Sequence, residues 1–159
     1  MSTNQSPLLL ACVALAFGAV ATITTTAQAA LGGSADSVAS DGSALRGQLR
    51  STAFVNYDVQ EIDTGALAVR EYLTRAGRVF AVSWQGPTLP DLQQLLGTYF
   101  GEFQTQVAAA RVNNAGIHRQ LLIDEPDLVV ASAGRLRDFF GIAYVPGLVP
   151  AGVSVGELQ

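Results

Sequence analysis

The sequence predicts an α+β domain in which an antiparallel sheet of about five to six strands packs one long amphipathic helix on one face. Two observations lead to this fold class. Residues 54–85 and 118–145 alternate apolar with polar side chains and contain short turns with Gly or Pro, as strands in hairpins do. Residues 88–111 instead place apolar side chains three and four positions apart, which is the spacing of an amphipathic helix. The predicted element order is β-β-β-α-β-β-β.

The composition is that of a folded domain. Of 159 residues, 49% are hydrophobic and 14% are charged, with nine basic and 13 acidic side chains for a formal net charge of -4. Such a chain can bury a core and does not resemble a disordered protein. Every basic residue is an arginine, and the sequence has no dense basic stripe. We therefore expect no nucleic-acid partner.

The first 29 residues have the pattern of a secretory signal peptide. No charged residue precedes Asp36, and an apolar stretch runs from Leu8 to Val20. Small side chains follow at Ala27-Gln28-Ala29, where a signal peptidase would cleave. The stretch is shorter than the roughly 20 residues that cross a bilayer as a helix. We expect a signal helix over residues 1–29, removed on export to the periplasm or the medium.

A membrane anchor is the alternative for the same segment. The residues before Leu8 include no Lys or Arg, although a signal peptide usually begins with positive charge, so an uncleaved anchor ending near Ile23 stays open. Cys12 follows Leu9-Leu10-Ala11 as in a lipoprotein motif, but the apolar stretch continues beyond it. Cys12 is the only cysteine, so cleavage leaves a mature chain without disulfides or thiol chemistry.

The mature chain begins with a short helix and three strands. Ser34 can cap a helix that reaches about Leu45, although Gly42 weakens it. Phe54–Ile62 then alternates apolar and polar side chains before a turn, which predicts a half-buried strand. The same pattern continues in two more strands over 67–74 and 78–85. These three segments predict an antiparallel meander.

The long helix follows two prolines that end the third strand. Thr88 can cap it, Asp91 complements its positive end, and the apolar spacing continues to about Arg111. Gly97 is a weak point inside it. Three further strands are predicted over 118–123, 128–132 and 135–145.

Several runs of sequence carry a family resemblance. They include Arg70-Glu71-Tyr72, Gly77-Arg78-Val79-Phe80-Ala81-Val82-Ser83-Trp84-Gln85-Gly86-Pro87, Gly134-Arg135-Leu136-Arg137 and Ala143-Tyr144-Val145-Pro146. With the runs around them, these resemble the bacterial domain-of-unknown-function family DUF2844 over nearly all of residues 30–155. The resemblance implies an exported bacterial protein and supplies no activity and no catalytic residues.

Two motifs that resemble reactive sites lack the rest of their machinery. Gly152-Val153-Ser154-Val155-Gly156 matches the nucleophile elbow of hydrolases, but an elbow needs an acid and a histidine later in the chain, and only three residues follow. His118 is the only histidine and lies upstream. Its neighbour Arg119 favours a polar strand residue over a metal ligand.

Carboxylates are the remaining candidates for chemistry. Asp124-Glu125-Pro126-Asp127 gathers three of them, but the proline and the spacing favour a solvated hairpin turn over a calcium loop. Arg70 and Glu71 should point to opposite faces of a strand, with a cross-strand pair to Arg78 as their structural role. Glu71 as a general acid is the alternative. No catalytic residue, cofactor site or metal ligand is assigned.

Two predicted strands end in an aromatic residue that is soon followed by Pro and Gly, in Trp84-Gln85-Gly86-Pro87 and Tyr144-Val145-Pro146-Gly147. If these strands are neighbours, their ends can form an apolar rim for a peptide, a glycan or a lipid-like ligand. The simpler alternative is that both rings complete the core under the helix. The candidate ligand or partner surface consists of Trp84, Pro87, Tyr144 and Pro146.

These inferences together favour an exported binding or accessory module that is not an enzyme. The expected organisation is a signal peptide over 1–29, a single α+β domain over 30–152 and a C-terminal tail over 153–159. An envelope protein, a glycan or a small ligand would bind the sheet face opposite the helix or an open sheet edge, with no cofactor. Membrane contact would come only through an uncleaved signal segment.

Two alternatives stay open at this point. One is a small envelope hydrolase that uses Glu71 or the turn from Asp124 to Asp127, and the other is a signal-anchored membrane module. A buried carboxylate beside an arginine in a cleft would favour the hydrolase. A shallow aromatic surface with exposed carboxylates would favour binding.

Overall fold

The structure, a computed structural model, describes residues 31–113 and 120–158. The predictions for the signal segment over 1–29, for Cys12 and for His118 lie outside the described residues. Within the described ranges, no helix is long and apolar enough to span a membrane.

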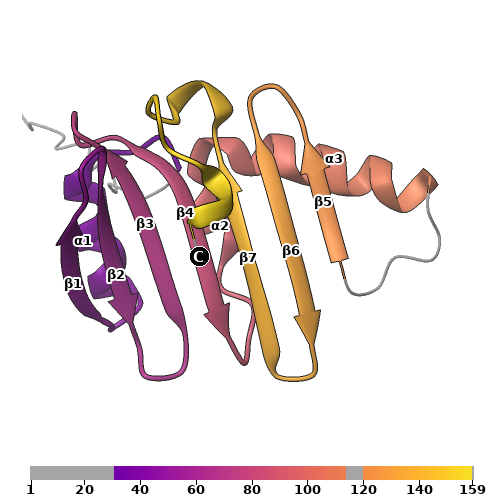
Figure 1. The fold of residues 1–159 in the computed structure, drawn as a ribbon. Coiled ribbons are helices and arrows are strands. Elements are labelled where there is room, and N and C mark those ends of the chain that lie inside the picture. Colours follow the sequence, from indigo (N-terminus) through magenta and orange to yellow (C-terminus); the bar gives the residue numbers. More distant parts are fainter. Residues whose placement is uncertain (1–30, 114–119, 159) are drawn as a thin grey trace, which may run out of the picture.

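One antiparallel sheet of seven strands confirms the predicted α+β class. The strands are β1 (Gln48–Ala53), β2 (Tyr57–Asp63), β3 (Ala68–Thr74), β4 (Val79–Gly86), β5 (Gln120–Asp124), β6 (Val129–Arg135) and β7 (Asp138–Tyr144). Their order across the sheet is β1-β2-β3-β4-β7-β6-β5. The helices that follow β4 lead to the far edge of the sheet, and β5 to β7 return strand by strand to β4 (Figure 1).

β1 is the strand that the sequence did not predict. All six of its residues are exposed, so they lack the alternation that a half-buried strand shows. The predicted strand over 54–62 begins later, at Tyr57, because the preceding residues connect β1 to β2. Arg75 donates side-chain hydrogen bonds to the carbonyl oxygens of Phe54 and Val55 and so holds this connection.

The predicted long helix is divided by a short 3-10 turn. The break begins at Gly97, whose φ of 51° lies in the left-handed region that glycine adopts most easily. The short helix predicted over 34–45 is also present. The helical elements are α1 (Ala35–Ala44), α2 (Leu92–Leu96), η1 (Gly97–Tyr99), α3 (Phe100–Asn113), η2 (Pro146–Leu148) and η3 (Val155–Glu157).

Asp91→Ala should lower the free energy of unfolding by about 1 kcal/mol, the typical value of an N-cap side chain. Oδ1 of Asp91 accepts hydrogen bonds from the backbone N–H groups of Gln93 at 2.9 Å and Gln94 at 3.2 Å. Thr88, the cap expected from the sequence, lies outside the helix and is exposed. Thr88→Ala is therefore the control, and urea denaturation of both variants is the measurement. Equal losses would contradict a cap made by Asp91.

The helices cover one face of the sheet, here called the helix face. α1 and α3 lie behind the strands in Figure 1. Val69, Val82 and Val130 of the sheet belong to the same buried cluster as Leu95 and Phe103 of the helical segments. This cluster is the larger part of the core, and it confirms the predicted packing of the helix on one face.

The opposite face, here called the outer face, carries a second apolar cluster around Tyr72, Phe80 and Ala81. Residues 146–158, here called the C-terminal segment, pack against this cluster through apolar side chains and lie in front of the sheet in Figure 1. Leu158 is 1% exposed there. The sequence predicted a C-terminal tail over 153–159, and Val153, Val155 and Leu158 of this stretch pack in the outer-face cluster.

Candidate functional site

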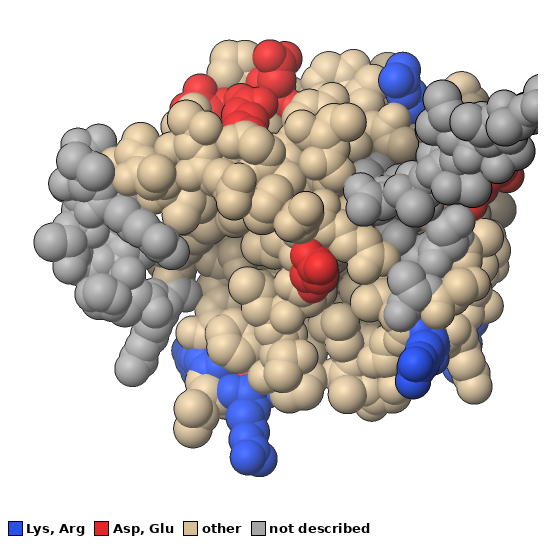
Figure 2. Space-filling model, turned by 180° about the vertical axis from the view of Figure 1, so that it is seen from behind, with Lys and Arg blue, Asp and Glu red and all other residues tan. Residues whose placement is uncertain are grey.

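The helix side of the molecule presents few charges. In Figure 2, most of the described surface is uncharged; acidic side chains gather at the upper left with another near the centre, and basic side chains lie at the bottom and the upper right. Neither sign forms a continuous patch across this side. A recognition site is therefore better sought on the outer face.

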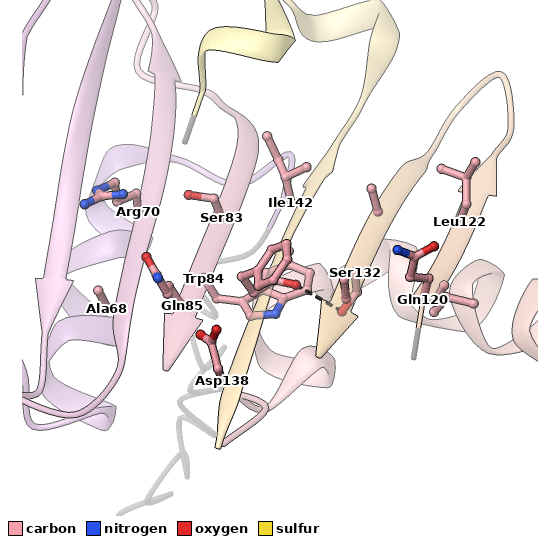
Figure 3. Close-up of a pocket in the computed structure, with 15 residues that line it drawn as sticks. Ala68, Arg70, Ser83, Trp84, Gln85, Gln120, Leu122, Ser132, Asp138 and Ile142 are labelled. Atoms are coloured by element: carbon pink, nitrogen blue, oxygen red, sulfur yellow. Dashed lines mark hydrogen bonds between the residues drawn. The ribbon is translucent and has the colours of Figure 1, made fainter. Parts of the chain in front are cut away.

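The outer face has a covered part and an open part. The C-terminal segment covers the cluster around Tyr72 and Phe80. Beside the segment, the uncovered strands form a groove with a volume of about 530 Å³. This volume lies within the range of roughly 300–1,000 Å³ that is usual for small-molecule sites. Figure 3 shows the side chains of β3, β4, β7, β6 and β5 around it.

Two rows of residues across these five strands form the groove, here called the outer-face groove. Within each row, neighbours face one another in the strand register, and the two rows lie two positions apart on every strand. Side chains with this spacing share one face of a sheet. The first row is Ala68, Gln85, Phe140, Ala133 and Gln120, and the second is Arg70, Ser83, Ile142, Ala131 and Leu122.

Small side chains in both rows give the groove its depth, since they leave space that larger residues would fill. The large apolar side chains project beyond these small residues. Phe140 is 48% exposed and Leu122 is 70% exposed. The small residues are Ala68, Ser83, Ala131 and Ala133.

The polar side of the groove is formed by β3 and β4. Nε of Arg70 lies 2.6 Å from Oε2 of Glu61, so its positive charge has a partner already. The hydroxyl groups of Ser83 and Tyr72 lie 3.2 Å apart. Burial raises the pKa of the Tyr72 phenol, and the hydrogen bond with Ser83 opposes this only in part. The phenol is therefore protonated at neutral pH, and the polar side carries little net charge.

A second hollow of about 360 Å³ continues the groove toward one end of the sheet. It shares Ala68, Gln85 and Asp138 with the groove. Its own lining adds Pro87 and Arg137, from the end of β4 and from the turn between β6 and β7. A ligand longer than the groove can therefore extend in this direction.

The four residues that the sequence singled out do not lie together. Trp84 is 2% exposed in the core of the helix face, whereas Tyr144 packs in the outer-face cluster. Their strands, β4 and β7, are neighbours, as the predicted apolar rim required. Because the two strands are antiparallel, however, Pro87 and Pro146 follow opposite ends of the sheet. Of these four residues, Trp84 alone lines the groove and Pro87 alone lines the second hollow.

Sequence reasoning missed most of the groove, including Gln85, Phe140 and Leu122. The alternation in the strand predicted over 135–145 does place Phe140 on the same face as Ile142. The neighbours of this strand are set by the strand order, which local alternation does not contain. The small residues of the two rows indicate a groove only once the strand order is known, because only that order places them next to one another.

Glu71 lies on the other face of the sheet from the groove, although it adjoins the groove residue Arg70 in sequence. It is 0% exposed, and in the register it faces Gln60 and Val82 on the helix face. Its backbone neighbour Arg70 points to the outer face, as predicted. Glu71 lines neither hollow, and Arg78 donates a hydrogen bond to the carbonyl oxygen of Gly32.

The other reactive motifs also stay apart from the groove. The turn from Asp124 to Asp127 joins β5 and β6, and its two aspartates are exposed. Ser154 is exposed and precedes η3, and the residues directly before it, 149–153, form no strand. In the part of the chain that the structure describes, no three His, Cys, Asp or Glu side chains group closely enough to hold a metal ion.

Comparison with known proteins gives one relationship. No curated protein and no solved structure matches the chain. The model of one family, described as "Protein of unknown function (DUF2844)", matches residues 27–158. This match covers every residue that the structure describes, including both rows of the groove. The chain belongs to the DUF2844 family.

Proposed function

We propose that this protein is an exported bacterial binding or accessory module that holds a weakly charged, amphipathic ligand in the outer-face groove. The observation that carries the proposal is the pair of rows across five strands. Together they offer exposed apolar side chains next to amides and hydroxyls in one concave surface. Concave sites that combine an apolar lining with a few polar groups are the usual form of ligand pockets.

The side chains of the groove indicate what such a ligand must offer. Phe140 and Leu122 would cover an apolar part of it. Gln85 and Gln120 each provide both a donor and an acceptor for its polar groups. Arg70 and Asp138 are the charged residues of the lining, and their charges are opposite. The groove therefore suits a ligand with little net charge.

Binding fits the groove better than hydrolysis does. A hydrolase of the predicted type would need a carboxylate such as Glu71 in contact with substrate. Glu71 is buried on the helix face, and the exposed carboxylate of the groove, Asp138, has no second carboxylate in the lining. A turnover by the exported protein that is lost in Glu71→Gln, with folding retained, would reverse this preference.

Export is part of the proposal. The signal-like composition of residues 1–29 supports it. N-terminal sequencing of the protein recovered outside the cytoplasm is the test. We expect a new N-terminus at residue 30, whereas an intact Met1 would favour the anchored module.

Phe140→Ser should weaken binding of the uncharged dye Nile red at least tenfold, about 1.4 kcal/mol, because it removes the exposed ring of the groove. Fluorescence titration of the full chain measures the dissociation constant. Leu49→Ser is the matched control, since Leu49 is 45% exposed on β1, outside the groove. Folding of both variants should change by no more than about 0.5 kcal/mol. Equal dye binding by both variants would contradict the assignment of the site.

A further inference from the structure

We infer that the ligand of the outer-face groove is an extended, weakly charged apolar peptide segment of a partner protein. This inference rests on the proposed function, because it names the class of ligand for the same groove. It starts from the C-terminal segment, which is a peptide that the outer face already binds.

The chemistry of the C-terminal segment shows what this face accepts. Residues 146–158 contain two prolines and one charged side chain, Glu157. The segment contacts the sheet through apolar side chains, which are Leu148, Val149, Val153, Val155 and Leu158.

Backbone pairing contributes little to this contact. The last backbone hydrogen bond to the sheet among the described residues runs from Val145 N–H to the carbonyl oxygen of Phe80, at 3.0 Å. Beyond it, the described backbone hydrogen bonds of the segment join residues three positions apart within or next to it. The outer face therefore binds a peptide by side-chain packing, which tolerates many apolar sequences.

The groove continues the surface to which the C-terminal segment is bound. Ile142 packs in the covered cluster and also lines the groove. Ser83 lines the groove and hydrogen-bonds to Tyr72 of the covered cluster. The next row of the register toward the segment contains Tyr72, Ala81 and Tyr144. The covered and open parts are thus consecutive rows of one face.

The dimensions and polar groups of the groove suit a short extended segment. Five strands spaced about 4.8 Å apart span about 19 Å, which is about six residues of extended chain. The amide side chains of Gln85 and Gln120 can each donate to a peptide carbonyl and accept from a peptide N–H. Opposite charges on Arg70 and Asp138 leave no net charge to select an anionic or cationic partner.

A phage-displayed library of random 12-residue peptides tests the inference. The full-chain protein is the bait, and phage that bind Phe140→Ser are removed by counter-selection. We expect enriched peptides rich in Val, Leu, Pro and Gly with at most one charge. As synthetic peptides they should displace Nile red and bind Phe140→Ser at least tenfold more weakly than Leu49→Ser. Enriched peptides that bind the three proteins equally would overturn the inference.

Two other probes separate this inference from the proposed function. They are oligosaccharides released from peptidoglycan and vesicles of phosphatidylethanolamine and phosphatidylglycerol. Displacement of Nile red by either of them, with none by the enriched peptides, overturns the peptide ligand and leaves a binding groove. Nile red binding that does not depend on Phe140 overturns both.

Discussion

Gly141→Ala should lower the free energy of unfolding by about 3 kcal/mol, toward the upper end of the cost of overpacking a core. Gly141 faces Trp84 across β7 and β4. A Cβ atom at Gly141 would overlap the indole ring and lie 2.8 Å from the carbonyl oxygen of Ala131. Trp84 is buried and cannot move aside into solvent, and the carbonyl belongs to the β6 backbone. The added methyl group must therefore displace a strand or the ring.

Gly147→Ala is the matched control for this prediction. Gly147 is exposed in η2, and a methyl group added there would meet no heavy atom within 4 Å beyond its chain neighbours. Urea denaturation should find the control within about 0.5 kcal/mol of the natural protein. Fluorescence of Trp84, the only tryptophan, should change in Gly141→Ala and not in the control. Equal stability of the two variants would show that the indole does not occupy this position.

The strands that the sequence predicted well are those that contribute many apolar side chains to the core. β3 and β4 contain Val69, Leu73 and Val82, and their apolar side chains follow the pleat. Gly77, with a φ of 75°, lies in the turn between them and has the conformation that a tight hairpin needs. Local pattern and tertiary packing agree in these segments, so alternation was sufficient.

The parts that were missed depend on long-range arrangement. β1 is exposed along its whole length and is a strand because β2 pairs with it, so its own residues carry no periodic signal. The groove depends on β7 lying beside β4, which brings Phe140 next to Gln85. Trp84 and Tyr144 were grouped because both end strands, but their positions differ by an odd number in the register and they face opposite sides.

Leu158→Asp should release the C-terminal segment from the sheet while the rest of the fold stays intact. Leu158 is 1% exposed against the outer-face cluster, and burying a carboxylate there without a partner costs several kcal/mol. Beyond Val145, the described backbone hydrogen bonds of the segment are local, so side-chain packing is what attaches it. Hydrogen exchange should speed up over residues 146–158, at least tenfold, with β4 still protected. Each chain of the variant should bind more Nile red, because Tyr72 and Phe80 become accessible to the dye.

Glu157→Ala is the control that separates release of the segment from a change in its charge. Glu157 adjoins Leu158 but is exposed, so its removal should leave hydrogen exchange and dye binding as in the natural protein. Release in Leu158→Asp should also let the enriched peptides bind a second copy per chain, because the vacated cluster is the same face with the same chemistry. Loss of protection in β4 together with the segment would mean that Leu158 supports the whole sheet. In that case the covered part of the outer face belongs to the core and cannot serve as a second binding surface.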